Sequence, residues 1–300
     1  RHGPPLLQPY HDLRKFFRKE AVISSGSGFI HKNAPFLILG IMILLSFLIP
    51  VQPGYTILAP LADFLGGAML FTLASVIMIF GALDTESNFS AMSAGRSAVF
   101  SALAEPTLIV VFFAVAIETG TNNPYITNAD LSTNSYLFLS LTHILATIAF
   151  LLFFIFETGK LPVEGGGLSE LSMIEDGRIY EYGGKNMFFI RYSSMIKQYL
   201  LGSLLLNVFI FPWGLQPGLI GSILDIPIML MKWILLIILL ILLEQSIARI
   251  RIFKITDFLA LSFCSFCSGC DSLCCRWFFM NTQQILDLII AAIILSAIWA

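Results

Sequence analysis

The sequence predicts an all-α integral membrane protein with about seven transmembrane helices. Of its 300 residues, 57% are hydrophobic and only 12% are charged, and the mean hydropathy is +0.85. A soluble domain usually carries about a quarter charged residues. At roughly 20 residues per crossing, the length allows about seven or eight helices and no sizeable soluble domain. The net charge is -2 and Lys and Arg are confined to short segments, so we expect no nucleic-acid partner.

Long apolar blocks, most of them free of charge, mark the expected spans. They cover residues 35–49, 64–83, 98–117, 131–156, 198–215 and 226–243. The third block contains Glu105 and the sixth contains Lys232. We expect a seventh span within residues 258–300, where apolar pieces flank a polar middle.

The basic residues predict the orientation, because short loops rich in Lys and Arg stay cytoplasmic. They precede the first span or follow the second, fourth and sixth: Arg1, Arg14, Lys15, Arg18, Lys19, Lys32, Arg96, Lys160, Arg178, Lys185, Arg191, Lys197, Arg249, Arg251 and Lys254. The loops near residues 50–60, 120–134 and 212–226 contain neither residue type. We therefore expect an inner-membrane protein with every basic loop in the cytoplasm.

Residues 5–20 have the pattern of an interfacial helix. Leu7, Tyr10, Leu13 and Phe17 recur at three- and four-residue spacing with basic residues between them. The alternative is a basic membrane-flanking segment without a specific role.

Carboxylates inside or at the ends of spans are candidate functional groups, because each costs at least about 2.5 kcal/mol in a bilayer. Glu105 lies within the third span before Pro106, and Glu118, Glu157 and Glu244 lie at span ends. Glu105 is the better candidate for a buried titratable group. For Glu118 and Glu244, a carboxylate at the headgroups is an equal alternative.

The loop between residues 157 and 197 is acidic in its first part. Its carboxylates are Glu157, Glu164, Glu170, Glu175, Asp176 and Glu181. Clustered and partly buried carboxylates raise one another's pKa, so the loop is a candidate proton funnel. The alternative is a solvated acidic loop. His143 is either a proton relay or a packing histidine, and Lys232 either snorkels or pairs with an acid inside the bundle.

Five cysteines lie close together near the end of the chain. Cys264, Cys267, Cys270 and Cys274 have the spacing of a ferredoxin cluster motif, but Cys275 stands where that motif has proline. The segment also lies where a membrane helix is expected. We therefore expect no metal site in this chain. The sequence also has no nucleotide-binding loop, HExxH motif or nucleophile elbow, so we expect no catalytic residue.

Several segments together resemble one family. They are Arg1-x-Gly3-Pro4-x-x-Leu7-Gln8-Pro9-x-x-Asp12, Ala82-Leu83-Asp84-Thr85, Ala102-Leu103-Ala104-Glu105-Pro106, Glu157-Thr158-Gly159-Lys160-Leu161-Pro162, Glu170-Leu171-Ser172-Met173-Ile174, Glu181-Tyr182-Gly183-Gly184 and Phe211-Pro212-Trp213-Gly214. They are similar to the membrane subunit of formate hydrogenlyase and hydrogenase-4, which is homologous to the quinone-site membrane subunit (ND1) of respiratory complex I. The likeness covers residues 1 to about 260.

The resemblance implies a non-catalytic anchor and ion-coupling subunit of an energy-converting [NiFe]-hydrogenase. The nickel–iron centre and iron–sulfur clusters would lie in partner subunits: the large and small hydrogenase subunits and a ferredoxin-like subunit. Antiporter-like membrane subunits would lie alongside. The acidic loop would line a cavity under the peripheral arm, and Glu105 would belong to a buried carboxylate chain. We expect Asp12, Lys15, Asp84, Arg96, Lys160 and Arg178 to dock the arm.

Two other functions remain open at this point. One is the quinone-site membrane subunit of a NADH:quinone oxidoreductase, and the other is a free-standing secondary transporter, for which internal repeats are typical but none is visible.

The resemblance also implies eight helices, with the first upstream of Arg1. Residues 261–300 have no counterpart in the family, and we expect residues near 264–279 to be read out of frame, which resequencing would test.

Overall fold

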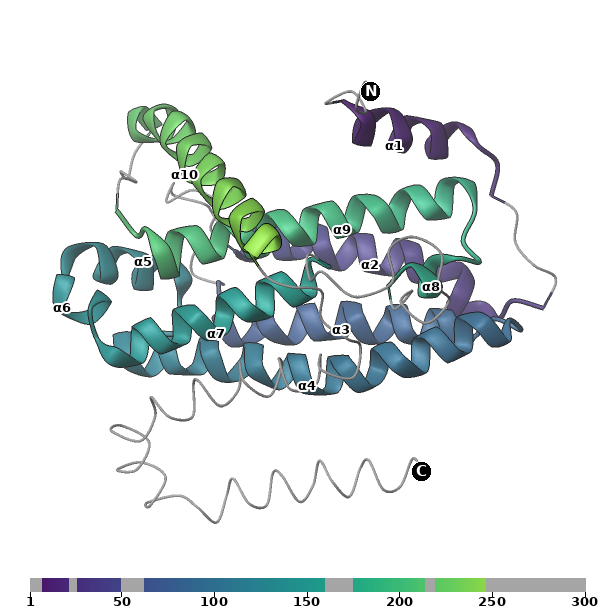
Figure 1. Cartoon of the computed structure of the whole chain (residues 1–300), viewed down its shortest axis with the longest axis horizontal. Coiled ribbons are helices and arrows are strands. Elements are labelled where there is room, and N and C mark those ends of the chain that lie inside the picture. The colour runs from purple at the N-terminus through teal and green to yellow at the C-terminus, as the bar shows by residue number, and fades with distance from the viewer. Residues whose placement is uncertain (1–6, 22–25, 50–61, 160–174, 214–218, 247–300) are drawn as a thin grey trace, which may run out of the picture.

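The computed structural model describes residues 7–21, 26–49, 62–159, 175–213 and 219–246. Within these ranges the chain is helical (Figure 1). The elements are α1 Gln8–Arg18, α2 Phe29–Leu48, α3 Phe64–Leu83, α4 Asn88–Thr119, α5 Pro124–Thr133, α6 Ser135–Phe138, α7 Leu141–Glu157, α8 Glu175–Ile179, α9 Gly184–Leu204, the π-helix η2 Leu205–Ile210 and α10 Leu219–Ser246. The all-α membrane class predicted from the sequence is confirmed.

Five helices of this part of the chain are long and apolar enough to cross a membrane. They are Phe29–Leu48, Phe64–Leu83, Asn88–Thr119, Gly184–Ile210 and Asp225–Leu243. The apolar helix α7 is shorter. These six helices correspond to the first six predicted spans. The expected seventh span, the cysteines and the expected frame change lie outside the described residues.

Several predicted boundaries differ from the structure. Helix α2 begins at Phe29 rather than at residue 35, and α4 begins at Asn88 rather than at residue 98, so that Arg96 lies within a helix. The predicted fourth span, 131–156, is divided into α5, α6 and α7. The predicted fifth span, 198–215, begins earlier, at Gly184, because Lys185, Arg191 and Lys197 lie within α9 rather than in a loop. A search for charge-free blocks misses a helix whose charges face a polar pocket.

Local sequence signals explain where the helices begin and end. The side chain of Asp63 accepts hydrogen bonds from the backbone N–H groups of Leu65 and Gly66 at the start of α3. The side chain of Ser140 accepts one from the N–H of His143 at the start of α7. Both residues satisfy backbone donors that the first helical turn leaves free. Helix α4 ends at Gly120, whose φ of 70° lies in the left-handed region that glycine adopts without strain.

The core is formed by large apolar side chains from α2, α3, α4, α7, α9 and η2. Phe150 on α7 stacks on Phe209 of η2, with ring centroids 4.6 Å apart, and packs against Phe112 of α4 at 5.6 Å. Helix α1 runs alongside α9, and α10 crosses the C-terminal part of α9 obliquely (Figure 1). The core thus fixes α4, α7 and α9 relative to one another, and these three helices carry the polar side chains discussed below.

Helix α1 has the amphipathic composition expected of an interfacial helix. None of its residues is buried, and Tyr10 and Phe17 are exposed. Phe17 packs edge-to-face on Phe188 of α9, with ring centroids 5.1 Å apart. The basic residues Arg14, Lys15 and Arg18 lie on the same short helix.

Candidate functional site

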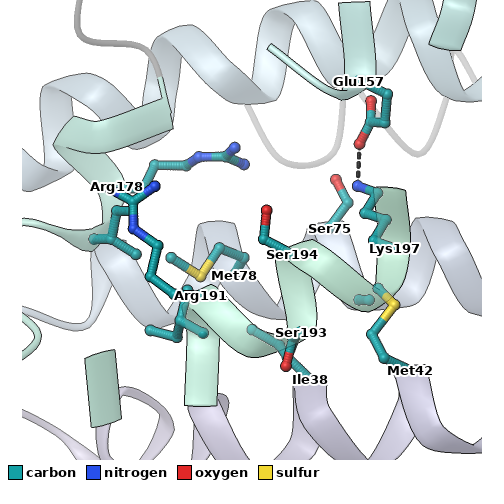
Figure 2. Close-up of a pocket in the computed structure, with 13 residues that line it drawn as sticks. Ile38, Met42, Ser75, Met78, Glu157, Arg178, Arg191, Ser193, Ser194 and Lys197 are labelled. Carbon is teal, nitrogen blue, oxygen red and sulfur yellow. Dashed lines mark hydrogen bonds and ion pairs between the residues drawn. The ribbon is translucent and has the colours of Figure 1, made fainter. Parts of the chain in front are cut away.

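A polar pocket of about 110 Å³ lies among α2, α3, α7, α8 and α9 (Figure 2). This volume is sufficient for several water molecules. Its apolar lining includes Ile38, Met42 and Met78, and its polar lining is formed by Ser75, Glu157, Arg178, Arg191, Ser193, Ser194 and Lys197. The pocket therefore combines basic and acidic groups beside membrane-spanning helices.

Glu157 and Lys197 form an ion pair across the pocket (Figure 2). Glu157 ends α7 and Lys197 lies within α9, so the pair joins two helices. The side chain of Lys197 is 20% exposed and that of Glu157 is 17% exposed. The pair is therefore largely removed from water but still reaches the pocket.

Ser75 connects the pocket to Glu105 in the middle of α4. Its hydroxyl donates a hydrogen bond to Glu105 Oε1 at 2.9 Å and lies 3.3 Å from the hydroxyl of Ser101. Glu157 and Lys197 are also close enough to Glu105 to interact with it electrostatically. We call Ser75, Glu105, Glu157 and Lys197 the pocket network.

The sequence after Glu105 also makes this position unusual. Pro106 lies inside α4 and has no N–H to donate to the carbonyl of Ala102. The carboxylate thus lies beside a backbone carbonyl that lacks its usual helical donor. Both groups add polarity to the middle of a helix whose sequence is largely apolar.

Helix α8 places Arg178 at the pocket with help from Gly177, and α9 adds Arg191. A Cβ at Gly177 would lie 2.4 Å from Ser93 Oγ of α4, so only glycine lets α8 approach α4 this closely. Arg178 follows directly, and both it and Arg191 line the pocket (Figure 2). Two guanidinium groups therefore add positive charge to the lining of the pocket.

Asp84, one of the predicted docking residues, has a structural role in the fold. Its carboxylate accepts a hydrogen bond from the N–H of His31 at 3.0 Å, and its backbone carbonyl accepts one from Gly28. The ring of His31 stacks on Tyr182, with centroids 4.1 Å apart, and His31 Nδ1 lies 3.0 Å from the carbonyl oxygen of Gly81. Asp84 thus anchors the start of α2.

The structure brings some of the predicted site residues together and separates others. Glu105, Glu157 and Arg178 lie in or next to the pocket. Asp12 and Lys15 lie on α1, where Asp12 accepts a hydrogen bond from Gln8, and Arg96 lies on α4 next to Met92. Glu181 lies between α8 and α9. Glu164, Glu170 and Lys160 lie outside the described residues, as do the side chains of Glu175, Asp176 and Glu244.

Sequence reasoning misses three members of this arrangement. The charge pattern places Lys197 and Arg191 in a loop, and nothing in the sequence singles out Ser75. The sequence does not predict the contact between Glu157 and Lys197, because the packing of α7 against α9 brings the two side chains together. Among the described residues, no group of three His, Cys, Asp or Glu side chains could hold a metal ion.

Comparison with known proteins identifies the family. The model of the NADH dehydrogenase family matches residues 1–267. The chain belongs to this family. It is of the ND1/H type, and its curated relatives are hydrogenase membrane subunits.

Two curated relatives come from Escherichia coli (strain K12). Formate hydrogenlyase subunit 4 is 29% identical over 256 residues, which cover 84% of this chain and 81% of that protein. Hydrogenase-4 component C is 26% identical over 261 residues, covering 84% of this chain and 79% of that protein. The resemblance predicted from the sequence motifs is confirmed.

A solved structure shares the fold. The structure of the membrane-bound sulfane sulfur reductase, an archaeal respiratory membrane complex, contains a chain that superposes with a TM-score of 0.75. The match covers 90% of this chain and 88% of that chain at 22% identity. Taken with the curated relatives, the chain is a membrane subunit of a multi-subunit complex related to complex I.

Proposed function

We propose that this chain is the membrane anchor and ion-coupling subunit of a [NiFe]-hydrogenase or formate hydrogenlyase complex. Electron transfer would take place in a peripheral arm on partner subunits, which would hold the nickel–iron centre and the iron–sulfur clusters. The names of the two curated relatives support this assignment. The chain itself would supply no redox group.

The pocket network supports the coupling role. A carboxylate in a membrane helix is costly and is retained where it serves transport. Glu105 is such a group, and Ser75 joins it to a pocket that has room for water. The pocket thus offers a route by which an ion could reach the middle of α4.

The mechanism we propose is electrostatic. A change of charge in a docked arm would strengthen or weaken the ion pair between Glu157 and Lys197, because both line the pocket and neither is fully buried. Glu105 interacts with both groups, so its affinity for a proton or sodium ion would change with them. Carboxylates serve both ions. Basic loops on the cytoplasmic side would face the arm.

Docking of the arm would use charged groups near the same end of the bundle. Arg178 lines the pocket, and Asp12 and Lys15 lie on the exposed helix α1. Arg96 and Asp84 would contribute from α4 and the end of α3. Lys160 and the acidic residues Glu164, Glu170, Glu175, Asp176 and Glu181 belong to the same proposed surface, and Glu244 to the proposed carboxylate path.

The Glu105→Gln variant tests the coupling role. The amide keeps the shape and can still accept the hydrogen bond from Ser75, but it cannot take up a proton. In the purified complex in sealed vesicles, we expect normal assembly and hydrogen evolution and a loss of ion translocation of at least roughly tenfold. Glu20→Gln, a change at an exposed carboxylate outside the spans, is the matched control. Unchanged translocation in Glu105→Gln would remove this residue from the path.

The family match favours a second candidate, a quinone-site subunit of a NADH:quinone oxidoreductase. Its distinguishing property is dependence on quinone. Hydrogen evolution by the purified, quinone-free complex supports the first assignment. Electron transfer that starts only when quinone is added supports the second.

A further inference from the structure

A second polar cluster lies at the end of the bundle opposite to α8, where α5, α6 and the start of α7 meet (Figure 1). Glu118 belongs to α4, thirteen positions after Glu105, or about 20 Å along the helix. Its side chain is only 6% exposed, and that of His143 is only 1% exposed. We call Glu118, Ser140, His143, Asn207 and Lys232 the π-helix cluster, because η2 lies at its centre.

The hydrogen bonds of His143 decide which ring nitrogen carries a proton. His143 Nε2 lies 3.3 Å from the backbone carbonyl oxygen of Phe209 in η2. A carbonyl oxygen can only accept, so Nε2 must be the donor. In the neutral ring, Nδ1 is then an acceptor.

Nδ1 faces another acceptor. It has no hydrogen-bond partner among the described residues and lies 3.9 Å from Glu118 Oε2. The other oxygen of that carboxylate, Oε1, accepts a hydrogen bond from the hydroxyl of Ser140. Two buried acceptors facing each other without a proton between them are unfavourable.

We propose that Glu118 and His143 form a proton-binding site that holds one shared, exchangeable proton. In one form the proton is on Glu118 Oε2 and His143 is neutral. In the other, the O–H bond breaks with its electron pair left on oxygen, and the proton bonds to Nδ1 to give an imidazolium beside a carboxylate. Burial favours the first form and the N-terminus of α7 favours a carboxylate, so both forms are within reach.

Ser140 connects this site to the surface. Its hydroxyl donates a hydrogen bond to Glu118, and Ser140 itself is partly exposed. A proton on Glu118 can therefore exchange with the medium at this end of the bundle. The site would serve as an exchange point separate from the pocket network.

Other charged groups at this end have partners of their own. Asp63 caps α3 and also bonds to Asn122, and Lys232 donates to Asn207 Oδ1 at 3.3 Å and to the carbonyl of Phe211 at 2.7 Å. Asp225 interacts electrostatically with Lys232 on the same helix. Asp130 and Tyr125 lie on α5.

A titration of the resting complex tests the shared proton. In the whole complex in vesicles, pH-difference infrared spectroscopy follows carboxyl and imidazole bands without turnover. We expect Glu118→Gln, His143→Gln and the double variant each to lose the same single protonation step, because a coupled pair titrates as one unit. Ser132→Ala is the matched control, since Ser132 donates to the backbone carbonyl of Ala129 within α5 at 2.7 Å and should change nothing.

Three outcomes would overturn the proposal. In the first, the two single variants lose different protonation steps and the double variant loses both. In the second, the spectrum of Glu118→Gln is identical to that of the unaltered complex. The third is a step that moves with sodium concentration, which would assign the site to a metal cation. If the His143 variant does not assemble, the spectrum of the Glu118→Gln variant alone decides the question. Because no transport is measured, the result is independent of the Glu105 test.

Discussion

The two polar clusters lie at opposite ends of one bundle and are held together differently. In the pocket network, side chains contact side chains: Ser75 bonds to Glu105, and Lys197 pairs with Glu157 beside a pocket with room for water. In the π-helix cluster, His143 and Lys232 also bond to backbone carbonyls.

The carbonyls come from η2 and the residue after it. Phe209 accepts from His143, Phe211 from Lys232, and the backbone of Asn207 from Asn128 at 2.6 Å. A π-helix widens the hydrogen-bonded turn and often occurs at functional positions. Removing a side chain from the π-helix cluster therefore leaves a buried carbonyl unpaired. In the pocket network, water can replace the lost contact.

The same substitution at each end gives the largest expected effect. Lys232→Met removes the donor to Phe211 and Asn207 in a buried site and should lower the free energy of unfolding by about 3 kcal/mol. Lys197→Met should cost less, about 1 kcal/mol, because water in the pocket can solvate the Glu157 carboxylate that loses its partner. Thermal unfolding of the purified complexes compares the two. Equal losses of unfolding free energy in the two variants would show that water does not replace the lost contact in the pocket network.

A smaller effect is expected at Ser75, and on transport rather than on stability. Ser75→Ala removes the hydroxyl that joins Glu105 to the pocket. The lost hydrogen bond corresponds to about 1 kcal/mol, so we expect ion translocation to fall roughly fivefold with assembly intact. The assay is the vesicle measurement used for Glu105→Gln.

The control for Ser75 is another buried serine. Ser97→Ala removes a hydroxyl that bonds only to the carbonyl of Ala94 in its own helix, at 2.9 Å. Its translocation should be unchanged. Equal losses in both variants would indicate a general packing effect and would remove Ser75 from the route.

Helix positions were predictable where charges stand outside the apolar blocks. Helix α3 has the predicted bounds, 64–83, because Asp63 and Asp84 stand directly before and after the uncharged run. Helix α9 begins earlier than predicted because Lys185, Arg191 and Lys197 lie within the helix, and the last two line the pocket. A pattern based on charge alone cannot distinguish a charged loop from a helix whose polar side is buried against other helices.

Candidate site residues were predictable as single positions but not as contacts. Glu105 stands out as a charge inside an apolar block, and its role in transport stays a prediction. Its neighbour Ser75 carries no such signal, since serine is common in membrane helices and the contact depends on the packing of α3 against α4. Glu118 lies near the end of α4, as a headgroup-level carboxylate would, and the structure places its side chain in a buried site beside His143.

The smallest expected effect concerns Tyr182, between α8 and α9 and outside both clusters. Its hydroxyl is buried and has no hydrogen-bond partner among the described residues. Burial, with a further contribution from Asp84, raises the pKa of the Tyr182 phenol above its usual value. In the folded protein the group therefore stays neutral at a pH where the unfolded chain loses the proton.

Tyr182→Phe should change the free energy of unfolding by less than about 0.5 kcal/mol at neutral pH, because no hydrogen bond is lost. As the pH rises above about 10, the unfolded tyrosine ionises, so the unaltered chain should lose up to about 1.4 kcal/mol per pH unit through this residue. The phenylalanine variant lacks that contribution, and its thermal unfolding should depend less on pH in the alkaline range. An unchanged alkaline dependence would show that the phenol ionises as readily in the fold as in the unfolded chain. A large loss at neutral pH would instead reveal a partner for the hydroxyl in the assembled complex.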